Sequence, residues 1–223
     1  MDNATSHRSR EYDGGVRATI PCYDSFQEAT IDLLSVVLPE PARWLDTGCG
    51  TGNLIAQVRG FFPGTGFVLA DPSPDMLEVA REKLFGAPEI EFVQGGTQSL
   101  DLPDGSFDVV TAMMCHHYGT KSDRRAAMLN CLRMLRKGGV CVVFENIRPR
   151  TAGGLVVGLE RWRRFQERSG KSPESVARHL GRFDRALFPI TIAEHLALYE
   201  EIGFETVEVL WASWMQAGFY MLR

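Results

Sequence analysis

The segment from residue 44 to residue 53, WLDTGCGTGN, constrains the fold of this chain more than any other part. An apolar entry ends at Asp46, and three glycines follow at alternate positions, Gly48, Gly50 and Gly52. Glycine permits sharp backbone turns and lets a ligand approach where a Cβ would clash. A helix that begins after such a loop points free N–H groups at a bound anion. The segment therefore predicts a strand, a ligand-binding loop and a helix in succession.

The glycine spacing separates this loop from two related ligand-binding loops. A dinucleotide fingerprint, G-x-G-x-x-G, would need a third glycine at the position of Asn53, which disfavours an NAD-dependent dehydrogenase. A phosphate-binding P-loop would end in Gly-Lys-Ser/Thr, and this segment does not. The remaining pattern, Asp-x-Gly-x-Gly-x-Gly, resembles that of class I S-adenosylmethionine (SAM) methyltransferases. The resemblance covers residues 43–144 and a hairpin near the carboxyl terminus.

Alternating apolar and helical patterns predict an α/β fold. Strands are expected at 43–46, 67–71, 90–93, 107–113 and 140–144, and helices at 23–37, 53–60, 74–85, 122–135 and 191–201. Residues 137–139 are expected to form a basic last helical turn and a glycine exit. Two further strands, 204–210 and 213–222, should form an antiparallel hairpin. The prediction is a doubly wound, seven-stranded, mostly parallel sheet with an antiparallel last strand, as the resemblance also implies.

Two segments outside the sheet pattern are expected to cover the ligand site. Residues 1–38 are predicted to form an arm, mobile or ordered by ligand over 1–19, and a helix above the cofactor. Residues 39–223 would form the SAM-binding domain, with a helical insertion after strand five as a substrate cap at about 150–188. Residues 148–185 contain ten Lys/Arg and four Asp/Glu. This excess is either a solvated helical face or a positive cap that attracts an anionic substrate.

Composition limits the classes of function. The net charge is −4, which argues against general nucleic-acid binding. No apolar run reaches about 18 residues, so no membrane-spanning helix is expected, and the first twenty residues lack the apolar core of a signal peptide. Five cysteines without a C-x-x-C pair fit reduced thiols. We expect a cytoplasmic enzyme, and a homodimer is compatible with the sequence.

The resemblance implies how SAM would be held. Asp46 would orient its methionine end, and Asp71, at the end of the second strand, would accept from the ribose hydroxyls or cap the next helix. Met76 would rest on adenine or belong to the core. Many relatives carry an acid at the position of Gly96. The cofactor-binding residues are predicted to be Asp46, Gly48, Cys49, Gly50, Gly52, Asn53, Asp71, Pro72, Met76, Gly96, Thr97, Gln98 and Met113.

The loop after the fourth strand, MMCHHY at 113–118, carries the candidate acid–base groups. A neutral histidine there could accept a proton from the acceptor. We predict His116, His117 and Glu145 as catalytic, with purely structural polar roles as the alternative. Adjacent histidines project differently and no acidic third ligand is evident nearby, so no metal site is expected. Nucleobase N-methylating enzymes commonly carry Asp/Asn-Pro-Pro-Tyr here, which makes that activity unfavoured.

The acceptor is expected to be a small molecule, anionic or aromatic. A helical cap over the cleft would use aromatic side chains to line an apolar pocket, although such residues are core by default. Arg148 would clamp a carboxylate or form a salt bridge at the strand end. The substrate contacts are predicted to be Tyr23, Tyr118, Arg148, Trp162 and Trp214.

Two other interpretations remain open. The segments 20–24, 194–204 and 211–219 are similar to carboxy-SAM synthase of tRNA wobble-uridine modification. The arginine that holds the extra carboxylate in that family corresponds to Leu198, so ordinary methyl transfer is favoured, although Arg148 or Arg182 could compensate. A catalytically silent SAM-binding module is the other alternative.

Overall fold

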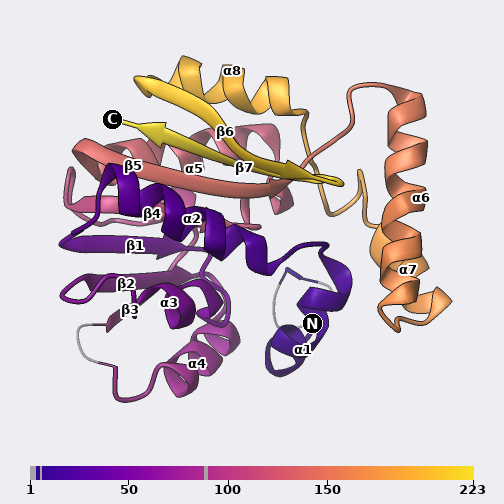
Figure 1. Ribbon diagram of the computed structural model, residues 1–223, viewed down its shortest axis with the longest axis horizontal. Coiled ribbons are helices and arrows are strands. Elements are labelled where there is room, and N and C mark those ends of the chain that lie inside the picture. The colour runs from indigo at the N-terminus through magenta and orange to yellow at the C-terminus, as the bar shows by residue number, and fades with distance from the viewer. Residues whose placement is uncertain (1–3, 6, 88–89) are drawn as a thin grey trace.

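A seven-stranded sheet forms the centre of the computed structural model, which describes residues 4–5, 7–87 and 90–223 (Figure 1). Its strands are β1 (Arg43–Thr47), β2 (Gly66–Asp71), β3 (Ile90–Gln94), β4 (Phe107–Met113), β5 (Leu135–Asn146), β6 (Thr206–Ser213) and β7 (Gln216–Leu222). The strand order is β3-β2-β1-β4-β5-β7-β6. The first five strands are parallel, and β7 runs antiparallel to both β5 and β6. The predicted fold class is confirmed.

Helices cover both faces of the sheet. Successive residues of β1 point to opposite faces, so that Trp44 packs in one apolar cluster and Leu45 in the other. Helices α2 (Asp24–Val37) and α3 (Asn53–Val58) contribute to the first cluster, and α5 (Lys121–Met134) and α8 (Ile192–Ile202) to the second. Because both faces are buried, the central strands are continuously apolar rather than alternating with polar residues.

Side-chain caps fix where several helices begin. The hydroxyl of Ser73 accepts from the N–H of Met76 at the start of α4 (Pro74–Lys83). Thr120 and Asp123 form a reciprocal capping box at the start of α5. Both helices begin on the carboxyl side of the parallel strands, α4 soon after β2 and α5 after the loop that follows β4.

The end of α5 differs from the prediction. The helix stops at Met134, and β5 begins at Leu135, so residues 137–139 belong to the strand instead of the last helical turn. Gly138 adopts a φ of 72°, and its N–H donates to the carbonyl of Arg223. The carboxyl terminus thus extends the pairing of β5, a distant contact that the local pattern Lys-Gly-Gly does not contain.

The limits of the hairpin strands differ slightly from the prediction, and the arm contains helical structure that the sequence did not predict. Strand β6 continues to Ser213, and the two connecting residues are Trp214 and Met215. The arm contains a short 3-10 turn, η1 (Ser9–Glu11), and helix α1 (Tyr12–Thr19). Tertiary contacts explain this order, because the carbonyl of Thr19 accepts from the indole of Trp162 at 2.6 Å. Residues 1–3 and 6 of the predicted arm lie outside the described residues.

The helical insertion is present as predicted. Helices α6 (Ala152–Arg168) and α7 (Pro173–Leu180) stand beyond one end of the sheet, on the same side as α1 (Figure 1). Trp162 of α6 is almost fully buried against α1 and packs edge-on against the ring of His179. The arm and the insertion therefore close the same end of the molecule, where the parallel strands terminate.

Two buried histidines make the fold sensitive to acid. His179 bonds Gln166 and His195 bonds Tyr199, each at 3.0 Å. Burial lowers the pKa of His179 to about 3 and that of His195 to about 4. The unfolded chain binds these protons near pH 6.5 and the folded chain does not, so stability is full above that pH and falls as pH drops toward about 4.

Urea unfolding between about pH 7.5 and about pH 4.5 measures this loss, which should reach about 1.4 kcal/mol per pH unit for each buried histidine. The variant His195→Gln should show a shallower loss than the wild-type chain, because one of the imidazoles whose pKa burial lowers is removed. Parallel pH profiles for the two proteins would contradict the assignment.

Candidate functional site

The glycine loop between β1 and α3 adopts left-handed backbone conformations. The φ angles of Gly48, Gly50 and Gly52 are 64°, 55° and 74°. A Cβ on Gly48 would lie 2.5 Å from the Cβ of Cys115, whereas a Cβ on Gly50 would meet nothing within 4 Å. The first glycine is thus required by packing. The second leaves open space beside the loop that a ligand can enter.

Asp71 is fixed beside this loop by two backbone N–H groups. One carboxylate oxygen accepts from Gly50 and the other from Ser73, each at 2.9 Å. Burial raises the pKa of Asp71, and these two hydrogen bonds act in the opposite direction. Each oxygen retains acceptor capacity toward the cavity, which suits the two adjacent hydroxyls of a ribose.

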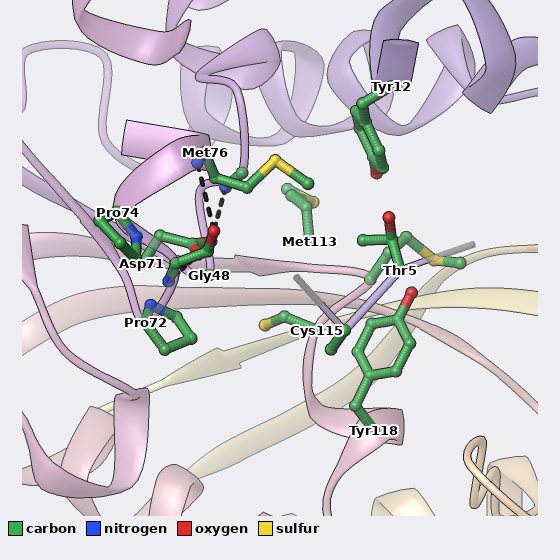
Figure 2. A pocket seen from close by; sticks show the side chains of 14 residues that line it. Thr5, Tyr12, Gly48, Asp71, Pro72, Pro74, Met76, Met113, Cys115 and Tyr118 are labelled. Atoms are coloured by element: carbon green, nitrogen blue, oxygen red, sulfur yellow. Dashed lines mark hydrogen bonds between the residues drawn. The ribbon is translucent and has the colours of Figure 1, made fainter. Parts of the chain in front are cut away.

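A cavity of about 350 Å³ opens in front of Gly50 and Asp71. Figure 2 shows Asp71, Pro72 and Pro74 on one side of it and Thr5, Tyr12 and Tyr118 on the other, with Met76 and Met113 above. The cavity lies outside the carboxyl ends of β1, β2 and β4, the usual ligand position in open α/β sheets. Its size falls in the range of small-molecule and cofactor sites.

A second cavity, of about 280 Å³, adjoins the first and shares Gly48, Pro72, Cys115 and Tyr118 with it. Three of the predicted cofactor-binding residues, Gly96, Thr97 and Gln98, form a wall of this cavity. A Cβ at residue 96 would lie 2.9 Å from the side-chain oxygen of Gln98. The Gln98 amide therefore lies beside the position where many relatives carry an acid, and glycine at 96 gives it room.

Nine of the thirteen predicted cofactor residues line one of these two cavities. Gly48, Gly50, Asp71, Pro72, Met76 and Met113 line the first, and Gly96, Thr97 and Gln98 line the second. Asp46, Cys49, Gly52 and Asn53 line neither. The carboxylate of Asp46 is buried and accepts from Thr111 at 2.8 Å, and burial, with the charge of Asp71, raises its pKa to about 7. A contact of Asp46 with SAM stays a prediction.

Sequence reasoning missed the arm residues that face the cavity. Thr5 and Tyr12 line it together with Ser73, Pro74, Met114 and Cys115. The four residues after β2 and β4 belong to segments that the motifs already marked. For Thr5 and Tyr12 the local sequence carries no signal, because the arm reaches the site only through its packing on α6 and on the glycine loop.

Asp13 of α1 joins the arm to the glycine loop. One carboxylate oxygen accepts from the Thr51 hydroxyl at 2.6 Å and from the Asn53 amide at 2.9 Å. The other lies 2.6 Å from the ammonium of Lys83. Burial opposes ionisation, but these partners together lower the pKa of Asp13. In this structure Asn53 holds the arm in place and does not line the cavity.

Loss of this junction should weaken cofactor binding without unfolding the domain. We expect Asp13→Ala to reduce the affinity for S-adenosylhomocysteine (SAH) by about tenfold, the equivalent of one charge-assisted contact. Isothermal titration calorimetry measures this change. Asp32→Ala is the matched control, since Asp32 is an exposed acid on α2 and should bind SAH as the wild-type chain does. Equal affinity in the two variants would show that the arm does not support the loop.

The predicted catalytic residues lie together. Both oxygens of buried Glu145 accept backbone N–H groups, from His116 at 2.9 Å and from His117 at 3.0 Å. The same carboxylate lies 2.5 Å from Nδ1 of His117. Burial opposes ionisation of Glu145, but His117, together with His116 and His195, outweighs it and lowers the pKa of Glu145 to about 2. A carboxylate here assigns the proton of neutral His117 to Nδ1 and leaves Nε2 as the basic nitrogen.

The basic nitrogen of His117 contacts Asn146. The Asn146 amide lies 3.1 Å from Nε2, and its oxygen accepts from Gln216 at 3.0 Å. The Gln216 oxygen is buried without a hydrogen-bond partner among the described residues. If both amides rotated, Asn146 would present its oxygen to a protonated Nε2, and Gln216 would accept from Asn146. The network can therefore satisfy either protonation state of His117.

Cys115, His116 and Glu145 also place potential metal-ligating atoms within 4.8 Å of one another. Both Glu145 oxygens are engaged by backbone N–H groups and by His117. Nε2 of His116 lies 3.2 Å from the hydroxyl of Thr97. Because the carboxylate already serves the histidine loop, we assign no metal role to this group.

The predicted substrate residues are dispersed, and Tyr118 is the one of them that lines the cavities. It borders both cavities described above and a third, of about 30 Å³, beside His117. The other four line none of the three. Arg148 pairs with Asp184, Trp162 bonds Thr19, Trp214 packs on Phe165, and the Tyr23 hydroxyl lies 3.5 Å from the Asn53 amide. Of the two roles expected for Arg148, the structure shows the salt bridge.

Comparison with known proteins agrees with this geometry. Residues 45–139 match the family model described as a methyltransferase domain. Over these residues the chain is similar to methyltransferase domains. The matched segment contains the glycine loop, Asp71, the wall at 96–98 and the His116–His117 loop. The resemblance to class I SAM-dependent methyltransferases is thereby confirmed.

Two curated relatives and one solved structure illustrate the extent of the similarity. A demethylmenaquinone methyltransferase of Thermus thermophilus is 36% identical over 118 residues, which cover 52% of this chain and 53% of that protein. A ubiquinone/menaquinone biosynthesis C-methyltransferase of Pseudomonas putida is 39% identical over 111 residues, 48% of this chain and 43% of that protein. The chain thus matches about half the length of these relatives.

A SAM-dependent methyltransferase of Thermotoga maritima superposes with a TM-score of 0.66 at 18% identity, covering 98% of this chain and 97% of that chain. This similarity extends the shared fold beyond the methyltransferase domain to the arm and the insertion. Among the described residues, no helix combines the length and apolar character needed to cross a membrane.

Proposed function

We propose that this chain transfers the methyl group of SAM to a small-molecule acceptor and releases SAH. One observation carries the proposal. The left-handed glycine loop and the fixed carboxylate of Asp71 face a cavity that shares Thr5, Tyr12, Met114 and Tyr118 with a smaller cavity lined by His117, the partner of Glu145. A cofactor site and a proton acceptor thus share one end of the sheet, as methyl transfer to a protonated nucleophile requires.

Some residues of the chain would hold the cofactor, and others would take part in proton transfer. Asp71 would accept from the ribose, Gly50 would leave room for close approach, and the 96–98 wall would border adenine. When bound, SAM supplies an electrophilic methyl carbon. As the acceptor atom forms a bond to this carbon, the electron pair of the broken carbon–sulfur bond stays with sulfur. Nε2 of His117 would take the proton that the acceptor loses once the Asn146 amide, which now donates to it, has turned away, while Glu145 keeps the imidazole in the required tautomer.

The names of the relatives support the small-molecule class. They are described as acting on demethylmenaquinone or in ubiquinone and menaquinone biosynthesis. Because the chain covers about half of those proteins, we carry over the class of acceptor and not its identity.

Incubation with a fractionated metabolite extract and deuterium-labelled SAM tests the proposal. We expect formation of SAH together with a product that carries the labelled methyl group, both detected by mass spectrometry. SAH binding without a labelled product in any fraction would indicate a silent SAM-binding module. If the protein does not bind SAH at all, the assignment of SAM as its cofactor is wrong.

The carboxy-SAM alternative gains no support from the structure. Leu198 packs against the apolar cluster of α5 and α8, and Arg148 is paired with Asp184. Mass spectrometry of the ligand that co-purifies with the protein distinguishes the two forms. We expect SAM or SAH, and a carboxylated form would reverse the preference.

A further inference from the structure

The second cavity adjoins the position proposed for the ribose. Pro72, which follows Asp71 directly, borders both the first and the second cavity, as do Cys115 and Tyr118. The volume of the second cavity, about 280 Å³, is larger than a purine ring requires. A nucleoside whose ribose is held by Asp71 can therefore place its base in the second cavity as the structure stands.

Arg124, in the first turn of α5, lines the second cavity and differs from the other cations of the protein. Its exposed fraction is 2%, and it is the buried member among the lysines and arginines that the structure describes. None of the ion pairs within residues 4–5, 7–87 and 90–223 includes it. A buried guanidinium without a carboxylate is costly unless other groups accept its hydrogen bonds.

The guanidinium of Arg124 has one hydrogen-bond partner within the described part of the chain. Nη2 donates to the carbonyl of Phe188 at 2.5 Å. The N–H of Phe188 donates to the carbonyl of His117 at 2.7 Å, so this bond also ties the end of the cap to the His117 loop. Nε is buried and has no partner among the described residues. Because a guanidinium carries five N–H donors, the protein leaves most of them unused.

The side chains beside Arg124 do not supply the missing acceptors. Gly96 has no side chain, and the hydroxyl of Thr97 is already bonded to that of Thr47 at 2.7 Å. Asp123 also lines the cavity, but it is exposed, and its carboxylate accepts from the N–H and the hydroxyl of Thr120 at 2.9 and 2.7 Å. The acceptors for Arg124 are therefore expected from a ligand.

His116 provides a second observation of the same kind. It lines the second cavity, and its Nδ1 is buried with no hydrogen-bond partner among the residues described. Both His116 and Arg124 are more than nine-tenths buried. Buried polar atoms without a partner are uncommon in folded proteins, so two such side chains in one cavity lining favour a polar ligand over simple packing.

We propose that Arg124 donates a hydrogen bond to a ring nitrogen of the adenine of SAM, which the second cavity holds. The proposal rests on the SAM-dependent function proposed above and adds a residue that recognises the cofactor. Adenine offers ring nitrogens that accept and one amino group that donates. A guanidinium only donates, so it selects the ring nitrogens. The bond is charge-assisted and poorly hydrated, and both properties strengthen it.

Analogues of SAH in which N1, N3 or N7 of adenine is replaced by C–H test the proposal. We expect one of these three deaza analogues to bind the wild-type chain at least about tenfold more weakly than SAH, as measured by isothermal titration calorimetry. Equal affinities for SAH and all three analogues would overturn the inference and leave the SAM-dependent function intact. If neither SAH nor any analogue binds, the function is wrong, and the inference with it.

Variants of Arg124 identify the donor. In Arg124→Met, the analogue that the wild type binds weakly should bind within about threefold of SAH, because the donor that distinguishes the two ligands is gone. Arg124→Gln should behave in the same way, and its amide can still donate to the Phe188 carbonyl if folding needs that bond. A purely structural role would weaken SAH and the analogue in parallel, so a selective loss that persists in both variants would overturn the assignment.

Arg125→Met is the matched control. Arg125 is the next residue of α5, pairs with Glu201 at 2.9 Å and lines neither the first nor the second cavity. This variant should bind SAH and the three analogues as the wild-type chain does. Loss of the selectivity in Arg125→Met as well would show that the effect does not belong to Arg124.

Discussion

Replacement of Gly50 by alanine should reduce the affinity for SAH by more than about tenfold, the largest binding loss expected from a single methyl group here. The new Cβ would meet no protein atom within 4 Å, so it would project into the space kept for the ligand. The φ of 55° also disfavours any side chain, at a cost of about 1–2 kcal/mol in an L-residue. Isothermal titration calorimetry with SAH measures the affinity, and thermal melting shows whether the variant folds.

Gly60→Ala provides the matched control. Gly60 also has open space around its Cβ position, but its φ is not in the left-handed region. It is exposed beyond the end of α3 and lines neither cofactor cavity. Wild-type affinity is expected for this variant. If Gly50→Ala binds SAH as tightly as Gly60→Ala does, the loop does not hold the cofactor.

Replacement of His117 by asparagine should lower kcat by about 10²–10⁴-fold, the usual contribution of a general base. His117 lines the third cavity and neither cofactor cavity, so the affinity for SAH should not change. Steady-state kinetics with the acceptor from the extract, together with SAH titration, separate these two quantities. Equal losses of kcat and of SAH affinity would indicate a structural role.

Glu145→Gln tests whether the carboxylate of Glu145 sets the tautomer of His117. The amide can still accept the backbone N–H of His116, but its own N–H group would face Nδ1 of His117 and favour the wrong tautomer. We expect a loss of kcat in the single variant and no further loss when it is combined with His117→Asn, because the two residues act as one unit. His195→Gln changes a nearby buried histidine that lines none of the three cavities and should retain kcat within about threefold.

Most of the fold could be predicted because its signals are local. Strands β1 to β4 are short apolar runs bounded by glycine, proline or acidic residues, and their observed limits differ little from the predicted ones. Two features that the sequence did not predict have a common cause. Residues 137–139 join β5 by pairing with the carboxyl terminus, and Thr19 ends a helix that Trp162 holds from far along the chain.

The candidate site likewise contains residues that the local sequence places and residues that only tertiary packing places. Gly48, Gly50, Asp71 and the 96–98 segment follow strand ends, so the sheet rule alone places them at one edge. Two of the aromatic residues expected to contact the substrate line none of the three cavities. Trp162 and Trp214 are bulky side chains in the insertion and the hairpin, and tertiary packing uses them against α1 and α6 instead of a cavity.

The sequence by itself determined the doubly wound sheet and the glycine loop, and it placed His116, His117 and Glu145 near the reacting end. Those features depend on periodicity, on glycine conformation and on the ends of parallel strands, which neighbouring residues encode. Only the tertiary structure decided that Asp13 joins the arm to the loop and that Arg148 is neutralised by Asp184. These outcomes depend on which distant segments meet, because a charge finds its partner in space and not in sequence.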